Sequence, residues 1–288
     1  MPTVSVIIPA YNAEPFIAET VKSALNQTYR DLEVIVVDDG SKDRTVERLA
    51  EFGDRIRVHR QANAGVAQAR NAGVNIATGS WIAFLDADDL WLPHKLEAQM
   101  AGSDAPMRYT NRFNIGAIGG LSPLQSDVTP MHEGDLFMPL LLAGNFITLS
   151  SVLVRRDVLD QAGGFFPGLS GAADWDMWLR VAERHPIGFC PEPLVRYRFH
   201  SDGMSRNHAA MGKERMRVVS RALLLERGRN LNWWVRRRVW AETWRTNGWD
   251  AWQAGARGHA LRDYARAAAA WPLEIRPYKE ALQVCLNA

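Results

Sequence analysis

The amino-acid sequence predicts an α/β protein with a mainly parallel sheet, helices on both faces of that sheet, and a C-terminal helical extension. Two observations predict the sheet. Short β-branched apolar runs alternate with segments of helical periodicity, and polar residues gather directly after the apolar runs. A third observation predicts the extension, because only helical patterns remain from about residue 205 onward. Strands that alternate with helices favour right-handed crossovers and therefore a parallel sheet.

The first hundred residues show this alternation most clearly. Each strand candidate is a short apolar run, whereas each helix candidate repeats its apolar residues every three or four positions. The strand candidates are residues 4–9 (VSVIIP), 32–41 (LEVIVVDDGS), 55–60 (RIRVHR) and 81–89 (WIAFLDADD). The helix candidates are residues 13–27, 42–52 and 64–79. The predicted order is therefore β-α-β-α-β-α-β.

The pattern is less regular between residues 101 and 204. Residues 121–130 are rich in Pro and Ser and are typical of a loop. The remaining candidates are strands at 108–120, 146–156 and 194–200 and helices at 134–144 and 173–185. We found no internal repeat and no low-complexity segment.

Composition excludes several classes of protein. A net charge of +2 provides no global field of the kind that indicates a nucleic-acid-binding protein. Cys190 and Cys285 lack disulfide or zinc spacing, so we expect free thiols in a reducing compartment. No run of 18 apolar residues predicts a membrane span, and the N-terminus lacks the features of a signal peptide. We therefore expect a cytoplasmic protein.

The predicted sheet brings polar residues together at one edge. Parallel α/β sheets bind ligands outside the carboxyl ends of their strands. The residues that follow the strand candidates are Pro9, Tyr11, Asn12, Asp38, Asp39, Asn63, Asp86 and Asp88. This edge is therefore the predicted site.

The segment FLDADDLW, residues 84–91, places three carboxylates after an apolar run. On an extended strand end, Asp86 and Asp88 share a face, whereas Asp89 points elsewhere. Two carboxylates without neighbouring Cys or His suit Mg²⁺ or Mn²⁺, which proteins usually hold together with substrate phosphates. The implied ligand is a diphosphate. The alternative is that Asp88 or Asp89 caps the helix that starts near Pro93.

Several motifs in order resemble glycosyltransferase family 2, whose members have the Rossmann-like, nucleotide-binding GT-A fold. The segments SVIIPAYNAEPFIAETVKSALNQTYRDLEVIVVDDGSKDRT and NAGVAQARNAGVNIATGSWIAFLDADD carry the resemblance. It is nearly gapless from about residue 3 to 97 and looser to about residue 202. It implies a donor-binding half at 1–100, an acceptor-binding half at 101–204 and a helical region at 205–288.

The resemblance implies a role for each motif residue. Pro9, Tyr11, Asn12 and Glu14 would line the nucleotide base pocket, and Asp39 would contact the base, commonly uracil. Arg70 would lie near the phosphates. Asp88 would bind Mg²⁺ or Mn²⁺ directly, Asp86 would lie nearer the ribose and the metal, and His200 would complete the metal shell or touch the diphosphate. The alternatives are that Tyr11 is a core aromatic, Asp39 a turn former, Arg70 a solvated helix residue and His200 structural.

Inverting sugar transfer needs a general base, and the family usually carries a Glu-Asp-x-Asp segment for it. GAADWDMWLR, residues 171–180, fills this place, and Asp174 is the expected base, with Asp176 in support. Ala173 stands where Glu is common, so Asp176 remains an alternative base. The alternative is that Asp174 and Asp176 have no catalytic role and only stabilise the N-terminus of a helix through its dipole.

The resemblance thus implies an inverting, metal-dependent transferase that moves a sugar, commonly from a UDP-sugar, to a hydroxyl of a glycan or lipid-linked acceptor. Such a transferase would be expected to act in polysaccharide biosynthesis at the cell envelope. Three alternative functions are compatible with parts of this pattern. A catalytically inactive nucleotide-sugar binder stays open because of Ala173. A phosphatase-like enzyme is disfavoured, because its DxD would lie on the first strand. A processive synthase is disfavoured, because its Gln-x-x-Arg-Trp motif is absent.

Residues 205–240 contain ten Lys or Arg residues against two acids, together with Trp233 and Trp234. Basic helices with Trp are typical of segments that lie on membranes, so peripheral contact with the inner face of the cell membrane is one interpretation. The other is a helical cap that packs its Trp side chains inward.

Overall fold

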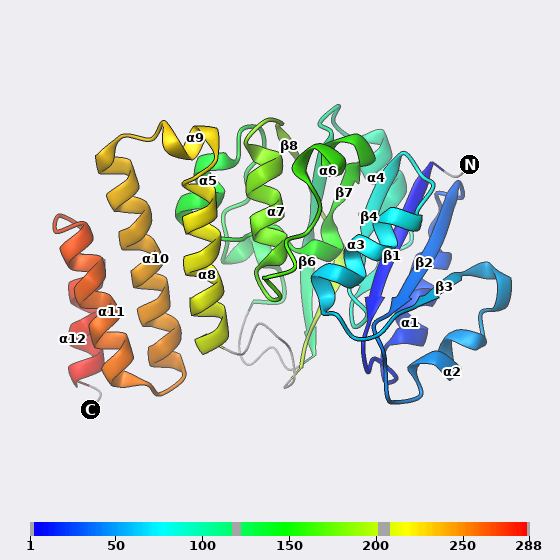
Figure 1. Cartoon of the computed structure of the whole chain (residues 1–288), viewed down its shortest axis with the longest axis horizontal. Helices are drawn as coiled ribbons and strands as arrows, with labels where there is room; N and C mark the ends of the chain where they lie inside the picture. Colours follow the sequence, from blue (N-terminus) through cyan, green and yellow to red (C-terminus); the bar gives the residue numbers. More distant parts are fainter. Residues whose placement is uncertain (1–2, 117–121, 201–207, 287–288) are drawn as a thin grey trace.

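The protein is described by a computed structural model, which covers residues 3–116, 122–200 and 208–286. A large sheet with its helices forms one side of the molecule, and the helices that follow residue 208 form the other (Figure 1). The α/β class and the C-terminal helical extension predicted from the sequence are confirmed.

One eight-stranded sheet, in the order β3-β2-β1-β4-β7-β6-β8-β5, runs through the molecule. Its first four strands are mutually parallel, and they are β1 (Val4–Ala10), β2 (Leu32–Asp38), β3 (Arg57–Arg60) and β4 (Trp81–Phe84). The other strands are β5 (Leu90–Trp91), β6 (Met107–Gly116), β7 (Leu153–Arg155) and β8 (Ile187–Phe199). β7 is antiparallel to both β4 and β6, whereas β6 and β8 are parallel.

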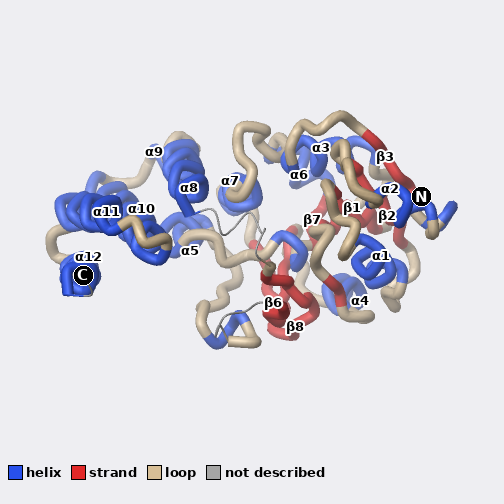
Figure 2. Tube along the Cα trace, turned by 90° about the horizontal axis from the view of Figure 1, so that it is seen from below, coloured by secondary structure: helices blue, strands red, loops and turns tan. Residues whose placement is uncertain are grey.

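Helices cover both faces of the sheet (Figure 2). On one face lie α1 (Ile17–Leu25) and α4 (Lys95–Ala101), and on the other α3 (Val66–Ile76) and α6 (Arg156–Ala162). The short α2 (Thr45–Ala50) connects β2 to β3. Helix α1 buries Ile17, Val21 and Ala24, which the sequence spaces at three and four positions. The apolar side chains on the two faces form two separate cores.

The second half of the chain adds α5 (Phe137–Ala143) and α7 (Ala173–Ala182), followed by five further helices. These are α8 (His208–Ala222), α9 (Glu226–Arg229), α10 (Trp233–Gln253), α11 (Arg257–Ala270) and α12 (Arg276–Leu286). Val218 and Val219 of α8 and Val239 of α10 belong to the core that also contains α7. The helical extension is therefore fixed to the sheet by a shared core.

Three details differ from the sequence-based expectation. β4 ends at Phe84, so Asp86, Asp88 and Asp89 lie in the turn after the strand and not on the strand itself. Residues 146–156 form a 3₁₀ turn and the short β7 instead of one strand. The two-residue β5 had no sequence signal.

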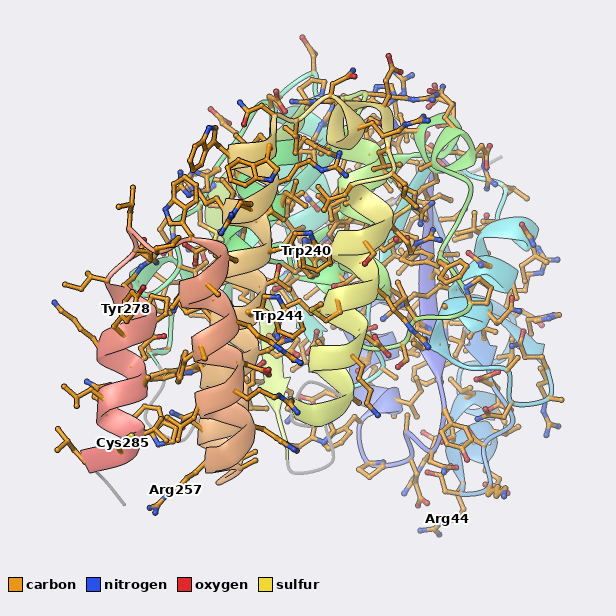
Figure 3. All side chains as sticks on the ribbon, turned by 60° about the vertical axis from the view of Figure 1, so that its left-hand side comes forward. Arg44, Trp240, Trp244, Arg257, Tyr278 and Cys285 are labelled. Atoms are coloured by element: carbon orange, nitrogen blue, oxygen red, sulfur yellow. The ribbon has the colours of Figure 1, made fainter. Side chains whose placement is uncertain are left out.

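The tryptophans of the extension divide between core and surface. Trp240 packs against the core, whereas Trp233 and Trp234 at the start of α10 are exposed. Figure 3 labels Trp240 and Trp244 on α10, and Tyr278 and Cys285 on the outermost helix, α12. No helix within the described residues is long and apolar enough to cross a membrane. Surface contact with a membrane stays a prediction.

Candidate active site

The candidate site lies at the carboxyl ends of β1, β2 and β4. The chain enters β1 at the upper right of Figure 1, so these strand ends lie at the lower edge of that view. Ala10 of β1 is paired with Asp38 of β2, which sets the two following loops side by side. The sheet register thus brings the predicted motifs to one edge.

The loop after β1 is tied to the turn after β2. The backbone N–H of Asn12 donates to Ser41 Oγ (3.0 Å), and Asn12 Oδ1 accepts from the N–H of Lys42 (2.8 Å). Asn12 has φ +50°, which Asn tolerates better than most residues. Pro9 is buried inside β1, whereas Tyr11 is 47% exposed at the edge. Tyr11 is therefore no core aromatic and is free to contact a ligand.

Glu14 lies at the rim of the same loop. Its carboxylate forms an ion pair with Arg44 Nη2 (2.7 Å), and this arginine is the main cause of a lowered pKa of Glu14. Glu14 thus helps to hold the loop after β1 against the start of α2.

Asp39 is almost fully buried and accepts three hydrogen bonds. They come from Gln61 Nε2 (2.7 Å) and from the backbone N–H groups of Ala64 and Gly65 (both 2.9 Å). The neighbouring Gly40 has φ +78°, and a Cβ there would lie 2.9 Å from the backbone N of Asn63. The turn therefore needs glycine, and Asp39 joins the β2 turn to the loop before α3.

Asp86 forms an ion pair with Arg70 of α3. Arg70 Nη2 lies 2.9 Å from Asp86 Oδ1, and the guanidinium is centred 5.5 Å from the ring centroid of Phe165. Arg70 is buried, and its Nε has no hydrogen-bond partner among the described residues. Arg70 is therefore not a solvated helix residue, and it brings a cation to the carboxylate turn.

Asp88 is in contact with His200, whose Nε2 lies 2.7 Å from Asp88 Oδ2. Burial raises the pKa of Asp88, and the negative charge of Asp86 raises it further, while His200 opposes this effect. Carboxylate oxygens suit Mn²⁺ or Mg²⁺, whereas an imidazole nitrogen better suits metals such as Zn²⁺, so the Asp88 carboxylate is the part of this pair that fits Mn²⁺ or Mg²⁺. The described residues contain no group of three His, Cys, Asp or Glu side chains arranged to hold a metal. The donor set thus fits a metal that takes its remaining ligands from substrate.

Asp89 has a different role from its neighbours. It is fully buried and accepts hydrogen bonds from Ser150 Oγ (2.6 Å) and from the N–H of Arg198 (2.9 Å). Ser150 Oγ also accepts from the N–H of Asp86 (3.0 Å), and Arg198 Nε donates to the Asp88 carbonyl (2.9 Å). Ser150 thus fixes the carboxylate turn to the 3₁₀ turn before β7, and Arg198 fixes it to β8. No sequence motif had singled out either residue.

Asp174 lies at the start of α7, half-buried. Asn145 Nδ2 donates to Asp174 Oδ2 (2.8 Å), and the N–H of Trp175 contacts Oδ1 (2.7 Å). Burial raises the pKa of Asp174 to about 6, with the charge of Arg70 lowering it and that of Asp86 raising it. Asp174 therefore lies within electrostatic reach of the carboxylate turn. Asn145 had no sequence signal either, because it follows α5 in the less regular half.

Asp176 is two residues away but faces a different environment. It is buried in ion pairs with Arg180 Nη2 (2.8 Å) and Arg221 Nε (2.6 Å). These arginines belong to α7 and α8, so Asp176 links the catalytic half to the helical extension. Of the two candidate bases, only Asp174 is grouped with Arg70 and Asp86.

Comparisons with known proteins bear on the family and the fold of the chain. The sequence profile of "Glycosyl transferase family 2" matches residues 5–161. An uncharacterized glycosyltransferase of Rickettsia conorii is 33% identical over 216 residues, which are 70% of this chain and 35% of that protein. Chondroitin synthase of Escherichia coli is 30% identical over 231 residues, 77% of this chain and 33% of the synthase. The chain spans about a third of the length of these two relatives.

Solved structures share the fold. The structure of residues 1–349 of TarS from S. aureus superposes with a TM-score of 0.68 at 18% identity, covering 98% of this chain and 88% of that one. The mannosyltransferase PcManGT from Pyrobaculum calidifontis gives 0.64 at 21% identity, with 99% and 80% covered. The fold predicted from the motifs, GT-A, is confirmed, and the profile match over more than half of the residues shows that the chain belongs to glycosyltransferase family 2.

Proposed function

We propose that the chain is an inverting, metal-dependent glycosyltransferase that moves a sugar from a nucleotide-diphospho-sugar to a hydroxyl of a glycan or lipid-linked acceptor. The observation that carries this proposal is Asp174, a carboxylate with a pKa of about 6 within electrostatic reach of Arg70 and Asp86. A base of this strength is suited to take a proton near neutral pH. UDP is the expected nucleotide. TarS has been solved with UDP and with UDP-GlcNAc, and PcManGT with GDP-Man and Mn²⁺.

Residues 1–100 would bind the donor. Tyr11 would cover the base of the nucleotide, and Asp39 would accept a hydrogen bond from it, since a carboxylate retains acceptor capacity beyond its three present bonds. Arg70 would face the diphosphate. Asp88 and His200, with Asp86, would hold Mg²⁺ or Mn²⁺, which would offset the negative charge that develops on the leaving diphosphate.

Residues 101–204 would bind the acceptor. Asp174 would remove the proton of the acceptor hydroxyl as that oxygen attacks the anomeric carbon. The bond between this carbon and the diphosphate oxygen breaks on the opposite face, so the configuration inverts and the nucleoside diphosphate leaves. Asn145 orients the carboxylate, and its donated hydrogen bond favours the ionised form that the reaction needs.

The test is Asp174→Asn, with release of nucleoside diphosphate as the readout. Turnover should fall by about 10²–10⁴-fold, while the affinity for the nucleotide-sugar stays within a factor of about two. Asp88→Asn is the matched comparison, because it should weaken donor binding in the presence of Mn²⁺. Unchanged turnover in Asp174→Asn would exclude Asp174 as the base.

The alternative function is that of an inactive nucleotide-sugar binder. The observation that favours this alternative is Ala173, which stands where the family often carries Glu. Its side chain is fully buried. Thermal-shift measurements with UDP-, dTDP- and GDP-sugars and Mn²⁺ would identify the donor. Binding of a donor that is never turned over, with or without added acceptors, would favour this alternative.

A further inference from the structure

A cavity of about 230 Å³ lies where the helical extension meets the catalytic half. Its walls are the C-terminal end of α5 with the following turn, the first turn of α7, and facing segments of α8 and α10. None of Tyr11, Asp39, Arg70, Asp86 and Asp88 lines it. The cavity is therefore separate from the residues assigned to the donor.

The cavity is connected to the proposed base through Asn145. Asn145 lines the cavity, and its side-chain Nδ2 donates to Asp174 Oδ2 at 2.8 Å. Gly171 and Trp175, which flank Asp174 in the chain, also line the cavity. Asp174 itself does not line the cavity, but a molecule in this space would contact the residues that adjoin it, on a wall that the donor residues do not form.

The charges that line the cavity are already paired. Arg215 Nη2 contacts Asp250 at 2.8 Å, and Glu242 contacts Arg245 at 3.0 Å. A lining without an unpaired cation offers little attraction for a phosphate or carboxylate ligand. The charges therefore favour a neutral ligand.

The remaining lining is a mixture of polar and apolar groups. Thr246 Oγ1 donates to the Glu242 carbonyl at 2.9 Å, which leaves its lone pairs available to accept. Leu141, Trp175 and Met211 add apolar surface. A sugar ring has hydroxyl groups at its edge and C–H groups on its face, so it matches both kinds of surface. The volume is of the order of one such ring rather than of an oligosaccharide.

We propose that this cavity binds a neutral saccharide unit of the acceptor, so that the helical extension forms part of the acceptor site. The proposal rests on the function proposed above, with Asp174 as base. Helices α8 and α10 share a core with α7, so packed side chains hold the walls of the cavity together. Acceptor choice then depends on the α10 residues that line the cavity as well as on residues 101–204.

The test fills the cavity from either wall. Ala143→Tyr would introduce an aromatic ring into the cavity from the exposed end of α5, and Thr246→Tyr would introduce one from α10. Ala265→Tyr, at an exposed position of α11 away from the cavity, is the control for an added tyrosine. The probes are the p-nitrophenyl glycosides of glucose, galactose, mannose and N-acetylglucosamine, and the affinity for UDP with Mn²⁺ is measured in parallel.

The two cavity variants should raise the KM for the accepted glycoside by about tenfold or more, whereas their affinity for UDP changes less than about twofold. The control should match the unmodified protein in both. Should Thr246→Tyr fail to fold, Ala143→Tyr decides alone, because its position is exposed. An unchanged KM in a folded cavity variant would overturn the proposal. Donor turnover to water without transfer to any glycoside would also overturn it, whereas absence of donor turnover would contradict the proposed function instead.

Discussion

Asp174 and Asp176 lie two positions apart, yet their replacement by Asn should change the stability of the protein in opposite directions. Asp174 has a pKa of about 6 against an ordinary 3.8. This difference corresponds to about 3 kcal/mol at neutral pH, since a tenfold change in an equilibrium is ~1.4 kcal/mol. Because the pKa is raised in the folded state, the folded protein binds more protons between these two values. The ionised carboxylate therefore lowers the free energy of unfolding above pH 6 and not below pH 3.8.

Asp174→Asn removes this unfavourable charge but provides only one oxygen for two donors, Asn145 Nδ2 and the N–H of Trp175. One donor then lacks a partner, at a cost of about 1–3 kcal/mol. We expect a net gain of about 1 kcal/mol at pH 7. Near pH 4, where the wild-type carboxyl is mostly protonated, the gain should be absent, because Asn then replaces a neutral group.

Asp176→Asn should instead lower the free energy of unfolding by about 3 kcal/mol, since it leaves Arg180 and Arg221 without their shared buried carboxylate. Urea denaturation of metal-free protein at pH 7 and at about pH 4 measures both variants against the wild type. If Asp174→Asn were destabilising at pH 7 by as much as Asp176→Asn, the distinction between the two environments would be wrong.

Five further results are expected. The kcat/KM should rise with pH through a midpoint near 6, the pKa of Asp174, and a flat profile between pH 5 and 8 would contradict the assignment of the base. Lys95→Met should stabilise the protein by about 1 kcal/mol, because burial lowers the Lys95 pKa and its Nζ has no hydrogen-bond partner among the described residues. Wild-type stability should increase from pH 7 to 9, since the unfolded chain binds the Lys95 proton more tightly, and an equal increase in Lys95→Met would refute this. Gly40→Ala should cost about 1–2 kcal/mol in chemical denaturation because of φ +78°, and a neutral effect would show that the turn relaxes. Replacing the exposed Trp233 and Trp234 by Ser should abolish sedimentation with anionic lipid vesicles, and a wild-type protein that stays in the supernatant would end the membrane prediction.

The parallel half of the fold was predictable because each strand and helix there is long enough to show its own period. Ile17, Val21 and Ala24 identified the buried face of α1 from spacing alone. The two-residue β5 is too short to show a period, and its pairing with β8 depends on residues more than a hundred positions away. The α/β class could therefore be predicted from local sequence pattern. The antiparallel strands could not, because their pairing depends on tertiary contacts.

The same division holds for the site. Asp39 and Asp86 were identifiable because each lies within two residues of a strand end, and the ends of parallel strands meet at one edge of the sheet. Asn145, Ser150 and Arg198 were not, because each acts through a contact with a distant part of the chain. Their residue types carry no signal at those positions.

Asp89, the third carboxylate of the turn, helps to fix the turn while the Asp88 carboxylate stays accessible to ligands. Asp89 is buried, and both burial and the charges of Asp88 and Asp86 raise its pKa well above the ordinary value. It is held by a hydroxyl and a backbone N–H, while the Arg198 guanidinium donates to a backbone carbonyl and to Glu19 instead. The turn is thus fixed in place without a guanidinium on the carboxylate of Asp88. The Asp88 carboxylate instead lies beside the imidazole of His200, where a cation that is bound together with a diphosphate would find an oxygen ligand.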